Sequence, residues 1–211
     1  ICRELLRYSF TRKDCLIAVG GGVMGDLAGF AAASYMRGID FINIPTTALA
    51  QIDSSIGGKV AVDLDGVKNI VGAFYQPKAV IADLSDLDTL PPRQLSNGLA
   101  EAVKAGLIAD PQLFALFEEE TLGLASIVRR SLEGKRRVGE QDEPEHSLRA
   151  ILNFGHTLGH GIESSLQLGG LYHGECVALG MLPMIEDPAL RERTIKIFQR
   201  LSLPTGGSFN R

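Results

Sequence analysis

The chain has 211 residues, of which 45% are hydrophobic and 22% are charged, and its mean hydropathy is +0.11. This composition is that of a globular protein of one or two domains, and it excludes disordered, collagen-like and coiled-coil chains. A net charge of −4 argues against a nucleic-acid partner, because proteins that bind nucleic acid usually carry a basic excess.

Cysteine usage and hydropathy together predict a soluble, cytoplasmic protein. Three scattered cysteines, Cys2, Cys15 and Cys176, are too few for a disulfide framework, and their odd number is typical of a reducing compartment. No apolar run approaches the roughly 18 residues that a membrane helix needs. The first residues also lack the apolar stretch of a signal peptide, so we expect neither a membrane partner nor export.

The first part of the chain alternates between strand and helix signals. Residues 15–19 form a short apolar run that ends in glycines, and residues 26–35 are an Ala-rich stretch of helical character. Residues 39–44 alternate β-branched and aromatic side chains up to a proline, and residues 79–82 form another short strand. Strands separated by helical segments predict an α/β fold with a Rossmann-like parallel sheet and helices on both of its faces.

From Pro91 onward the sequence shows helical periods without strand signals. The first expected helix covers residues 97–109, and a second follows Asp110, an N-cap residue, and runs to residue 120. Further helices are predicted at 148–166, 174–184 and 188–201. We therefore expect an α/β domain over residues 1–88 and an all-α domain over residues 89–211.

A glycine loop follows the first predicted strand. Gly20-Gly-Gly-Val-Met-Gly-Asp26 satisfies G-x-G-x-x-G, in which glycines let the backbone approach a phosphate at a helix N-terminus. The usual fingerprint also has an acidic residue at the end of the next strand, but Asp40 lies at the start of that strand. The sequence thus indicates a dinucleotide or phosphate loop in a variant arrangement, or only a tight turn. Asp26 could cap the helix or bind a ribose or nicotinamide amide.

Three of the four histidines lie close together in the second half of the chain. His156 and His160 are four residues apart, which places both imidazoles on one helix face, and His173 follows a glycine-containing loop. Glu101 is a candidate fourth member, because a carboxylate in an otherwise apolar helix usually needs a partner. This set predicts a metal site with an open coordination position, although each histidine alone is also compatible with an ordinary hydrogen-bonded role.

Several cations stand alone beside Gly, Ser or Asn instead of in a solvated run. Cations that converge from separate elements are what a phosphate or carboxylate ligand needs, so they predict an anionic substrate. The residues are Arg37, Lys59, Lys68, Lys104, Lys135 and Arg149. By contrast, the arginines at 129, 130, 136 and 137, next to acidic residues 140–145, are expected to form a mixed solvent-facing surface.

These motifs and several others follow one another along nearly the whole chain. They are Gly20–Asp26, Tyr35–Gly38, Pro45–Thr47, Asp53–Lys59, Lys68-Asn69, Leu90–Arg93, Ala100–Lys104, Asn153–Thr157 with His160, and His173–Glu175. In order and spacing the series resembles the 3-dehydroquinate synthase family.

The resemblance implies a sugar phosphate cyclase that uses NAD and one divalent metal, usually zinc or cobalt. Members of the family convert 3-deoxy-D-arabino-heptulosonate 7-phosphate to 3-dehydroquinate and phosphate in the shikimate pathway, on the route to chorismate and aromatic amino acids. A ring hydroxyl is oxidised, phosphate is eliminated, the ketone is reduced again, and the opened ring closes in an aldol reaction. The enzyme is thus a carbon–oxygen lyase that acts on phosphates.

Carried over residue by residue, the resemblance assigns three groups of site residues. The metal ligands would be Glu101, His156 and His173. The cofactor contacts would be Gly21, Gly22, Val23, Met24, Gly25, Asp26, Thr46, Thr47, Lys59, Lys68, Asp86, Leu87, Asp88 and Thr89. The substrate contacts would be Asp53, Asn69, Lys104, Lys135, Arg149, Asn153 and His160. Arg37 matches a residue that reaches the active site of a neighbouring subunit, so a homodimer is expected.

Alternatives remain open at this point. Other sugar phosphate cyclases, which form aminodehydroquinate, valiolone or deoxyinosose products, share most of these residues. Metal-dependent polyol dehydrogenases share the glycine loop and the histidine pair, although they need no cluster of phosphate-binding lysines. Chains of the resembled family are longer and supply a further part of the nucleotide-binding sheet. The sheet is therefore expected to be incomplete. The 211 residues would be either an incomplete record of a longer protein or an inactive nucleotide-binding remnant.

Overall fold

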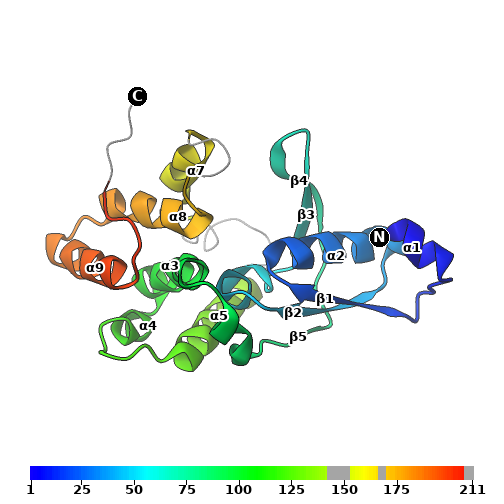
Figure 1. Cartoon of the computed structure of the whole chain (residues 1–211), viewed down its shortest axis with the longest axis horizontal. Helices are drawn as coiled ribbons and strands as arrows, with labels where there is room; N and C mark the ends of the chain where they lie inside the picture. Colours follow the sequence, from blue (N-terminus) through cyan, green and yellow to red (C-terminus); the bar gives the residue numbers. More distant parts are fainter. Residues whose placement is uncertain (142–152, 166–169, 207–211) are drawn as a thin grey trace. The chain divides into compact units, whose positions relative to one another are not determined.

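The computed structural model describes residues 1–141, 153–165 and 170–206 of the chain (Figure 1). It divides into two compact units, Ile1–Leu90 and Pro91–Arg211. The first contains strands and helices, and the described residues of the second are helical. The predicted fold class, an α/β part followed by an all-α part, is confirmed.

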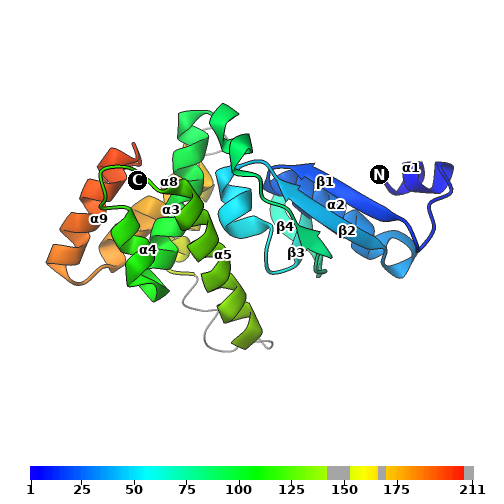
Figure 2. The same cartoon turned by 90° about the horizontal axis from the view of Figure 1, so that it is seen from below.

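A parallel three-stranded sheet forms the centre of the first unit. Its strands are β1 (Cys15–Gly20), β2 (Asp40–Pro45) and β5 (Ala79–Val80), in the order β1-β2-β5. The helix α2 (Gly22–Ser34) connects β1 to β2 and packs along both, as Figure 2 shows. The predicted strands thus form, whereas α2 begins four residues before the predicted helix and includes most of the glycine loop.

Gly29 lets α2 lie close to its neighbours. A Cβ atom at this position would collide with Val60 Cγ1 and lie 3.1 Å from Phe41 Cζ. Phe41 and Val60 belong to the buried cluster of the unit, together with Leu5, Ala32 and Ile39. Leu5 comes from α1 (Cys2–Arg7), so the first helix is tied to the sheet through this core.

An antiparallel hairpin follows β2 in the chain, in a segment for which the sequence analysis named no element. β3 (Lys59–Leu64) pairs with β4 (Val67–Phe74), and the two-residue loop Asp65-Gly66 has positive φ angles of 50° and 79°. Two positive φ angles are typical of a type I′ turn, for which Asp-Gly is a favoured sequence. Along the chain, the hairpin stands between β2 and β5, in the connection where two parallel strands usually have a crossover helix.

The prediction of helices on both faces of the sheet is therefore wrong for residues 1–90. Ile17 and Val19 of β1 are 60% and 55% exposed, whereas Ala18, which points to the opposite face, is buried. Short turns complete the unit: η1 (Tyr35–Arg37), the π-helical η2 (Ala50–Ser54) and η3 (Leu84–Thr89).

The second unit is built around α3 (Pro92–Ala109), which packs against α4 (Pro111–Leu116), α5 (Leu124–Gln141) and α8 (His173–Met181). Figure 2 shows α3, α4 and α5 side by side. The helix α7 (His156–Ser165) packs on α8, which is followed by the short turn η4 (Leu182–Met184) and by α9 (Pro188–Arg200). Fully buried side chains of this unit include Val103, Leu113, Phe117, Ile127 and Phe198.

Helices of the second unit differ from the prediction mainly at their ends. α3 begins five residues early, at a proline suited to the first helical turn, and α5 was not predicted. Residues 148–152 and 166 of the predicted helix 148–166 lie outside the described residues. None of the described helices combines the length and the apolar character needed to cross a bilayer.

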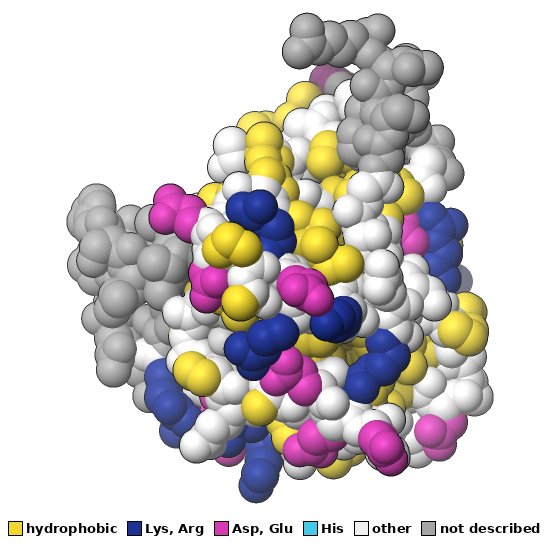
Figure 3. Space-filling model, turned by 90° about the vertical axis from the view of Figure 1, so that its left-hand side faces the viewer, with side chains coloured by type: hydrophobic (Ala, Val, Ile, Leu, Met, Phe, Trp, Pro, Cys, Tyr) yellow, Lys and Arg dark blue, Asp and Glu magenta, His cyan; other side chains and the backbone are white. Residues whose placement is uncertain are grey.

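Charges of both signs share the surface of the second unit. On the face seen in Figure 3, basic and acidic side chains lie next to each other among apolar ones. The ion pair Lys196–Glu192, 2.8 Å, lies on exposed α9 positions. Arg130 is different from the solvent-facing arginine that we expected, because its side chain is 28% exposed and forks onto Asp110 with N–O distances of 2.7 and 3.0 Å.

Asp110 is expected to stabilise the second unit in a pH-dependent way. Burial opposes ionisation, but the Arg130 guanidinium and the N–H groups of Leu113 and Gln112 outweigh it and lower the pKa of the Asp110 carboxyl below 3.8. A depressed pKa stabilises the fold above the unfolded value, and this stabilisation is lost as the pH falls through the folded value. We expect Asp110→Asn to lower the free energy of unfolding at pH 7 by about 1–2 kcal/mol. Urea denaturation should show that difference shrink below pH 4; a constant difference would contradict the assignment.

Candidate metal centre

A buried carboxylate on α3 lies at the centre of the histidine group. Glu101 is 3% exposed, and its Oε1 atom lies 3.7 Å from His156 Nε2 and 3.5 Å from His173 Nε2. Lys104 Nζ lies 2.5 Å from Oε2. Among the described residues, neither carboxylate oxygen has a partner in hydrogen-bond geometry. A buried ionised carboxylate needs a cation, which Lys104 supplies at Oε2, whereas Oε1 faces the two histidines without a hydrogen bond.

The first residues of two helices are histidines that face this carboxylate. His156 is the first residue of α7 and His173 is the first residue of α8, and their ring centroids are 5.4 Å apart. Gly155, with φ +77°, makes the turn that precedes α7. Glu101, His156 and His173 each offer one ligand atom within 4.8 Å of the others. One carboxylate and two imidazoles form a donor set that suits zinc or cobalt and leaves a coordination position open.

The electrostatics favour the ligating protonation states of Glu101 and His156. Burial alone would raise the pKa of Glu101, but Lys104 and the two histidines hold it well below its usual value. Burial and Lys104 lower the pKa of the His156 imidazole. At neutral pH, Glu101 is therefore ionised and His156 is neutral, which are the forms that bind a metal.

His173 lies between two carboxylates. Its Nδ1 atom is 3.6 Å from Glu163 Oε2 on α7, on the side of the ring opposite Glu101. Burial opposes protonation, yet the two carboxylates outweigh it and raise the pKa of the imidazole. Metal-bound histidines commonly hold their second nitrogen against such a carboxylate, which fixes the orientation of the ring. The sequence analysis did not single out Glu163, although it lies seven residues after His156 on the same face of the helix.

His160 completes the cluster from an exposed position on α7. Its ring centroid lies 5.4 Å from that of His156 and 5.8 Å from that of His173. The structure therefore brings together Glu101, Lys104, His156, His160 and His173, all of which the sequence analysis named. Of the remaining predictions in this unit, Lys135 lies half-buried on α5, Asn153 is exposed just before α7, and Arg149 lies outside the described residues.

In the first unit, the glycine loop lies close to the end of β2. Gly20 ends β1 with φ +151°, and its carbonyl accepts a hydrogen bond of 2.9 Å from the N–H of Thr46. A Cβ atom at Gly21 would lie 3.1 Å from Thr47 Cγ2, and one at Gly25 would lie 2.8 Å from Asn43 Nδ2. The glycines thus permit a tight turn and close helix–strand packing, the roles they have in dinucleotide-binding loops. Val23 and Met24 are exposed at the start of α2.

A pocket of about 400 Å³ lies next to this loop, within the same unit. Asp26, Lys59 and Asn69 line it, together with apolar residues of the hairpin. All three were predicted from the sequence to contact cofactor or substrate. Asn69 adopts φ +53°, and its N–H donates to Asp63 Oδ1 at 2.8 Å, so the strand is locally distorted where the side chain meets the pocket.

The other predicted residues of this unit are distributed over its turns. Asp53 lies half-buried in η2, Lys68 is exposed on β4, and Arg37 is exposed in η1 with φ +66°. Within η3, Leu87 is a buried apolar side chain, and Asp86, Asp88 and Thr89 are at least partly accessible.

Comparison with known proteins supplies the family. The family model described as 3-dehydroquinate synthase N-terminal matches residues 1–97, and the one described as 3-dehydroquinate synthase C-terminal matches residues 98–206. The chain belongs to the 3-dehydroquinate synthase family. A relative from Caldanaerobacter subterraneus subsp. tengcongensis, named 3-dehydroquinate synthase, is 53% identical over 92% of this chain. The alignment covers 59% of that relative, so the chain spans well under two thirds of its length.

Two solved structures have a similar fold. A 2-epi-5-epi-valiolone synthase from Streptomyces hygroscopicus subsp. jinggangensis, with NAD⁺ and Zn²⁺ bound, is 29% identical with a TM-score of 0.89; the match covers 98% of this chain and 62% of that one. A 2-deoxy-scyllo-inosose synthase complexed with carbaglucose-6-phosphate, NAD⁺ and Co²⁺ is 30% identical with a TM-score of 0.87. That match covers 100% of this chain and 61% of the other.

Proposed function

We propose that the protein is a 3-dehydroquinate synthase, which converts 3-deoxy-D-arabino-heptulosonate 7-phosphate to 3-dehydroquinate and phosphate with NAD and one divalent metal. The observation that carries the proposal is the buried Glu101 carboxylate, whose Oε2 pairs with Lys104 and whose Oε1 faces His156 and His173 without a hydrogen bond among the described residues. The relative that is 53% identical supports this substrate over those of the other cyclases, whose structures are 29% and 30% identical.

Glu101, His156 and His173 would hold the metal. A divalent ion bound there would polarise a substrate hydroxyl and lower its pKa. Lys104 keeps Glu101 ionised, and Glu163 holds the second nitrogen of His173. His160 lies beside both ligand histidines but is exposed, so its imidazole can accept a proton from substrate or bind the phosphate group.

The glycine loop and its surroundings would bind NAD, which supplies a hydride acceptor regenerated in each turnover. Free N–H groups at the start of α2 suit the pyrophosphate, and the glycines leave room for it. The proposed cofactor contacts remain Gly21, Gly22, Val23, Met24, Gly25, Asp26, Thr46, Thr47, Lys59, Lys68, Asp86, Leu87, Asp88 and Thr89.

Cationic and polar side chains named in the sequence analysis would bind the carboxylate and the phosphate of the substrate. Lys104 and Lys135 come from the helical unit, and Asp53 and Asn69 come from the α/β unit. Arg149 and Asn153 are proposed contacts as well. Arg37 would complete the active site of a second copy of the chain, which makes the active enzyme a homodimer.

Phosphate release tests the proposed reaction. The protein is incubated with the heptulosonate phosphate, NAD and zinc, and phosphate and dehydroquinate are measured together with absorbance at the NADH wavelength. We expect equal amounts of the two products without net NADH. Net NADH formation with a polyol would support a dehydrogenase instead. Turnover of a different sugar phosphate alone would support a related cyclase.

Substitutions of Asp26 and Asp40 test whether the cofactor loop has the variant arrangement or the usual one. Asp26 is half-buried in the pocket beside Lys59, whereas Asp40 begins β2 and lies 3.5 Å from Lys78. We expect Asp26→Asn to weaken NADH binding about tenfold, since it removes a charged hydrogen-bond partner. Asp40→Asn, the matched control, should leave binding unchanged. NADH fluorescence reports both values without a tryptophan background, because the chain has no tryptophan. The reverse order of effects would contradict the variant arrangement.

A further inference from the structure

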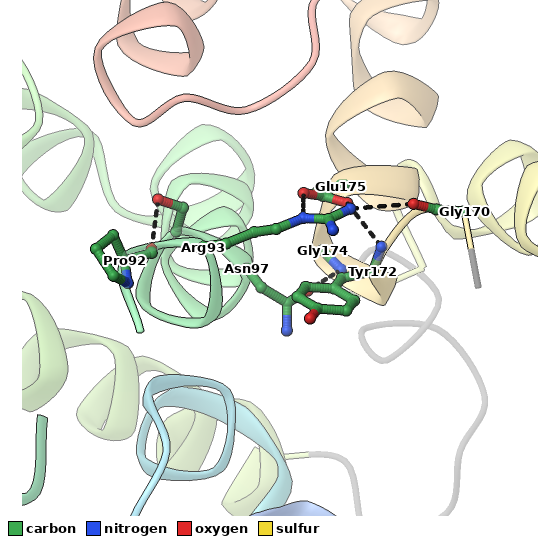
Figure 4. Close-up of polar contacts among 8 residues, drawn as sticks. Pro92, Arg93, Asn97, Gly170, Tyr172, Gly174 and Glu175 are labelled. Carbon is green, nitrogen blue, oxygen red and sulfur yellow. Dashed lines mark hydrogen bonds and ion pairs between the residues drawn. The ribbon is translucent and has the colours of Figure 1, made fainter. Parts of the chain in front are cut away.

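One face of α3 carries polar side chains at a four-residue spacing. Arg93, Asn97 and Glu101 follow one another along this face, and Glu101 is the carboxylate of the proposed metal centre. Arg93 and Asn97 make their contacts with the residues around the start of α8, where His173 lies, as Figure 4 shows. Neither residue is among the predicted ligands of metal, cofactor or substrate.

Arg93 holds the start of α8 through several contacts at once. Its Nε donates to Glu175 Oε1 at 2.7 Å, and its Nη2 donates to Glu175 Oε2 at 2.8 Å and to the Gly170 carbonyl at 3.0 Å. The guanidinium also lies over the Tyr172 ring, 4.2 Å from its centroid. Glu175 is buried, and its Oε2 accepts a hydrogen bond of 2.7 Å from the Tyr172 N–H, which caps the helix. A planar fork of this kind fixes both distance and orientation.

Asn97 fixes the other side of His173. Its Oδ1 atom accepts a hydrogen bond of 2.6 Å from the Gly174 N–H. A Cβ atom at Gly174 would overlap the Asn97 carbonyl oxygen, so the two backbones lie in direct contact. His173 is thus flanked in sequence by Tyr172 and Gly174, and each of these neighbours is tied to α3, directly or through Glu175.

We propose that Arg93 is a positioning residue of the metal centre: together with Asn97 it holds the first turn of α8 against α3, and so sets His173 at the distance from Glu101 that a shared metal ion needs. The proposal rests on the metal centre proposed above. Arg93 touches no ligand atom; it acts through Glu175 and the Tyr172 backbone. Lysine cannot replace it, because an ammonium group lacks the fork and the flat face that stacks on Tyr172.

Arg193 provides a matched control in the same unit. It forks onto Glu118 with N–O distances of 2.7 and 2.8 Å, and its guanidinium lies 5.2 Å from the Phe114 ring centroid. Its side chain is 51% exposed, against 50% for Arg93. Both arginines thus fork onto a glutamate and lie over an aromatic ring, but Arg93 also donates to the Gly170 carbonyl, and only its partner belongs to the helix turn that begins with His173.

Zinc affinity measured by competition with a colorimetric chelator tests the proposal. We expect Arg93→Lys to weaken zinc binding about 10- to 100-fold, the range found when a residue that orients a metal ligand is lost. Arg193→Lys should change it less than twofold. The absorption spectrum of the Co²⁺-loaded protein should also change with Arg93→Lys and not with Arg193→Lys. Urea denaturation of both metal-free variants checks that their stabilities are similar.

Equal zinc affinities for the two variants would overturn the positioning role, provided that wild-type protein binds zinc and Glu101→Gln does not. Wild-type protein that binds no zinc, or Glu101→Gln protein that binds it normally, would overturn the metal centre and the positioning role with it. If Arg93→Lys fails to fold, Glu175→Gln decides the question: the amide still accepts the Tyr172 N–H, but the ion pair is lost. Zinc affinity retained in that variant would overturn the proposal.

Discussion

Glu101→Gln is expected to remove zinc binding and to destabilise the metal-free protein as well. The amide lacks the negative charge that a metal ligand supplies, so zinc affinity should fall by about 100-fold or more. Lys104 is only 5% exposed and would lose the carboxylate that lies 2.5 Å from its Nζ. A buried charge without its partner costs about 3–5 kcal/mol, and this loss should appear in urea denaturation without any metal.

A second substitution separates the two effects. In Glu101→Gln/Lys104→Met the buried ammonium is replaced by an apolar side chain of similar length, so most of the lost stability should return. Zinc affinity should stay low, since the ligand is still absent. Zinc binding that recovers with stability in the double variant would contradict the ligand role of Glu101.

His156→Ala is expected to lose zinc binding and turnover with little change in folding, because this imidazole is half-buried and its pKa is lowered, so it carries no charge.

Much of the metal centre could be predicted because its signals are local. The four-residue spacing of His156 and His160 places them on one helix face. A carboxylate in the apolar stretch of α3 indicates that a partner lies nearby, because a buried charge needs one. Arg93 and Glu175 are different. They are 82 residues apart, and although each belongs to a motif of the series, neither motif indicates its partner. Only the packing of α8 on α3 joins them, and no periodicity in either segment encodes that contact.

The hairpin β3–β4 was not predicted from the sequence, for a different reason. Its Asp65-Gly66 turn between two β-branched runs is a strong local hairpin signal, but Lys59, Lys68 and Asn69 in the same segment were interpreted for their chemistry alone. The start of α2 was misplaced for a physical reason. Glycine disfavours helices, so the prediction began after the loop, whereas close packing against Thr47 and Asn43 requires glycine in the first helical turns.

Gly180→Ala is expected to separate α7 from α8 and thereby to damage both the fold and the metal centre. A Cβ atom at this position would overlap the Gly155 carbonyl oxygen and lie 2.8 Å from the Gly159 N atom. Both contacts are with backbone, which cannot rotate away as a side chain can. Overpacking of this kind should lower the free energy of unfolding by about 3 kcal/mol. Because Gly155 directly precedes His156, the displaced turn should also move this histidine away from Glu101 and weaken zinc binding.

Gly161→Ala is the control on the same helix pair. Nothing lies within 4 Å of a Cβ atom at this exposed position of α7, so alanine should stabilise the helix by up to about 1 kcal/mol and leave zinc affinity unchanged. Thermal or urea denaturation and chelator competition on both variants give the two readouts. The opposite signs of the two stability changes are the decisive feature, since general intolerance of α7 and α8 to larger residues would destabilise both. If Gly180→Ala were as stable as wild type, the backbone contact that sets His156 beside His173 would be wrong.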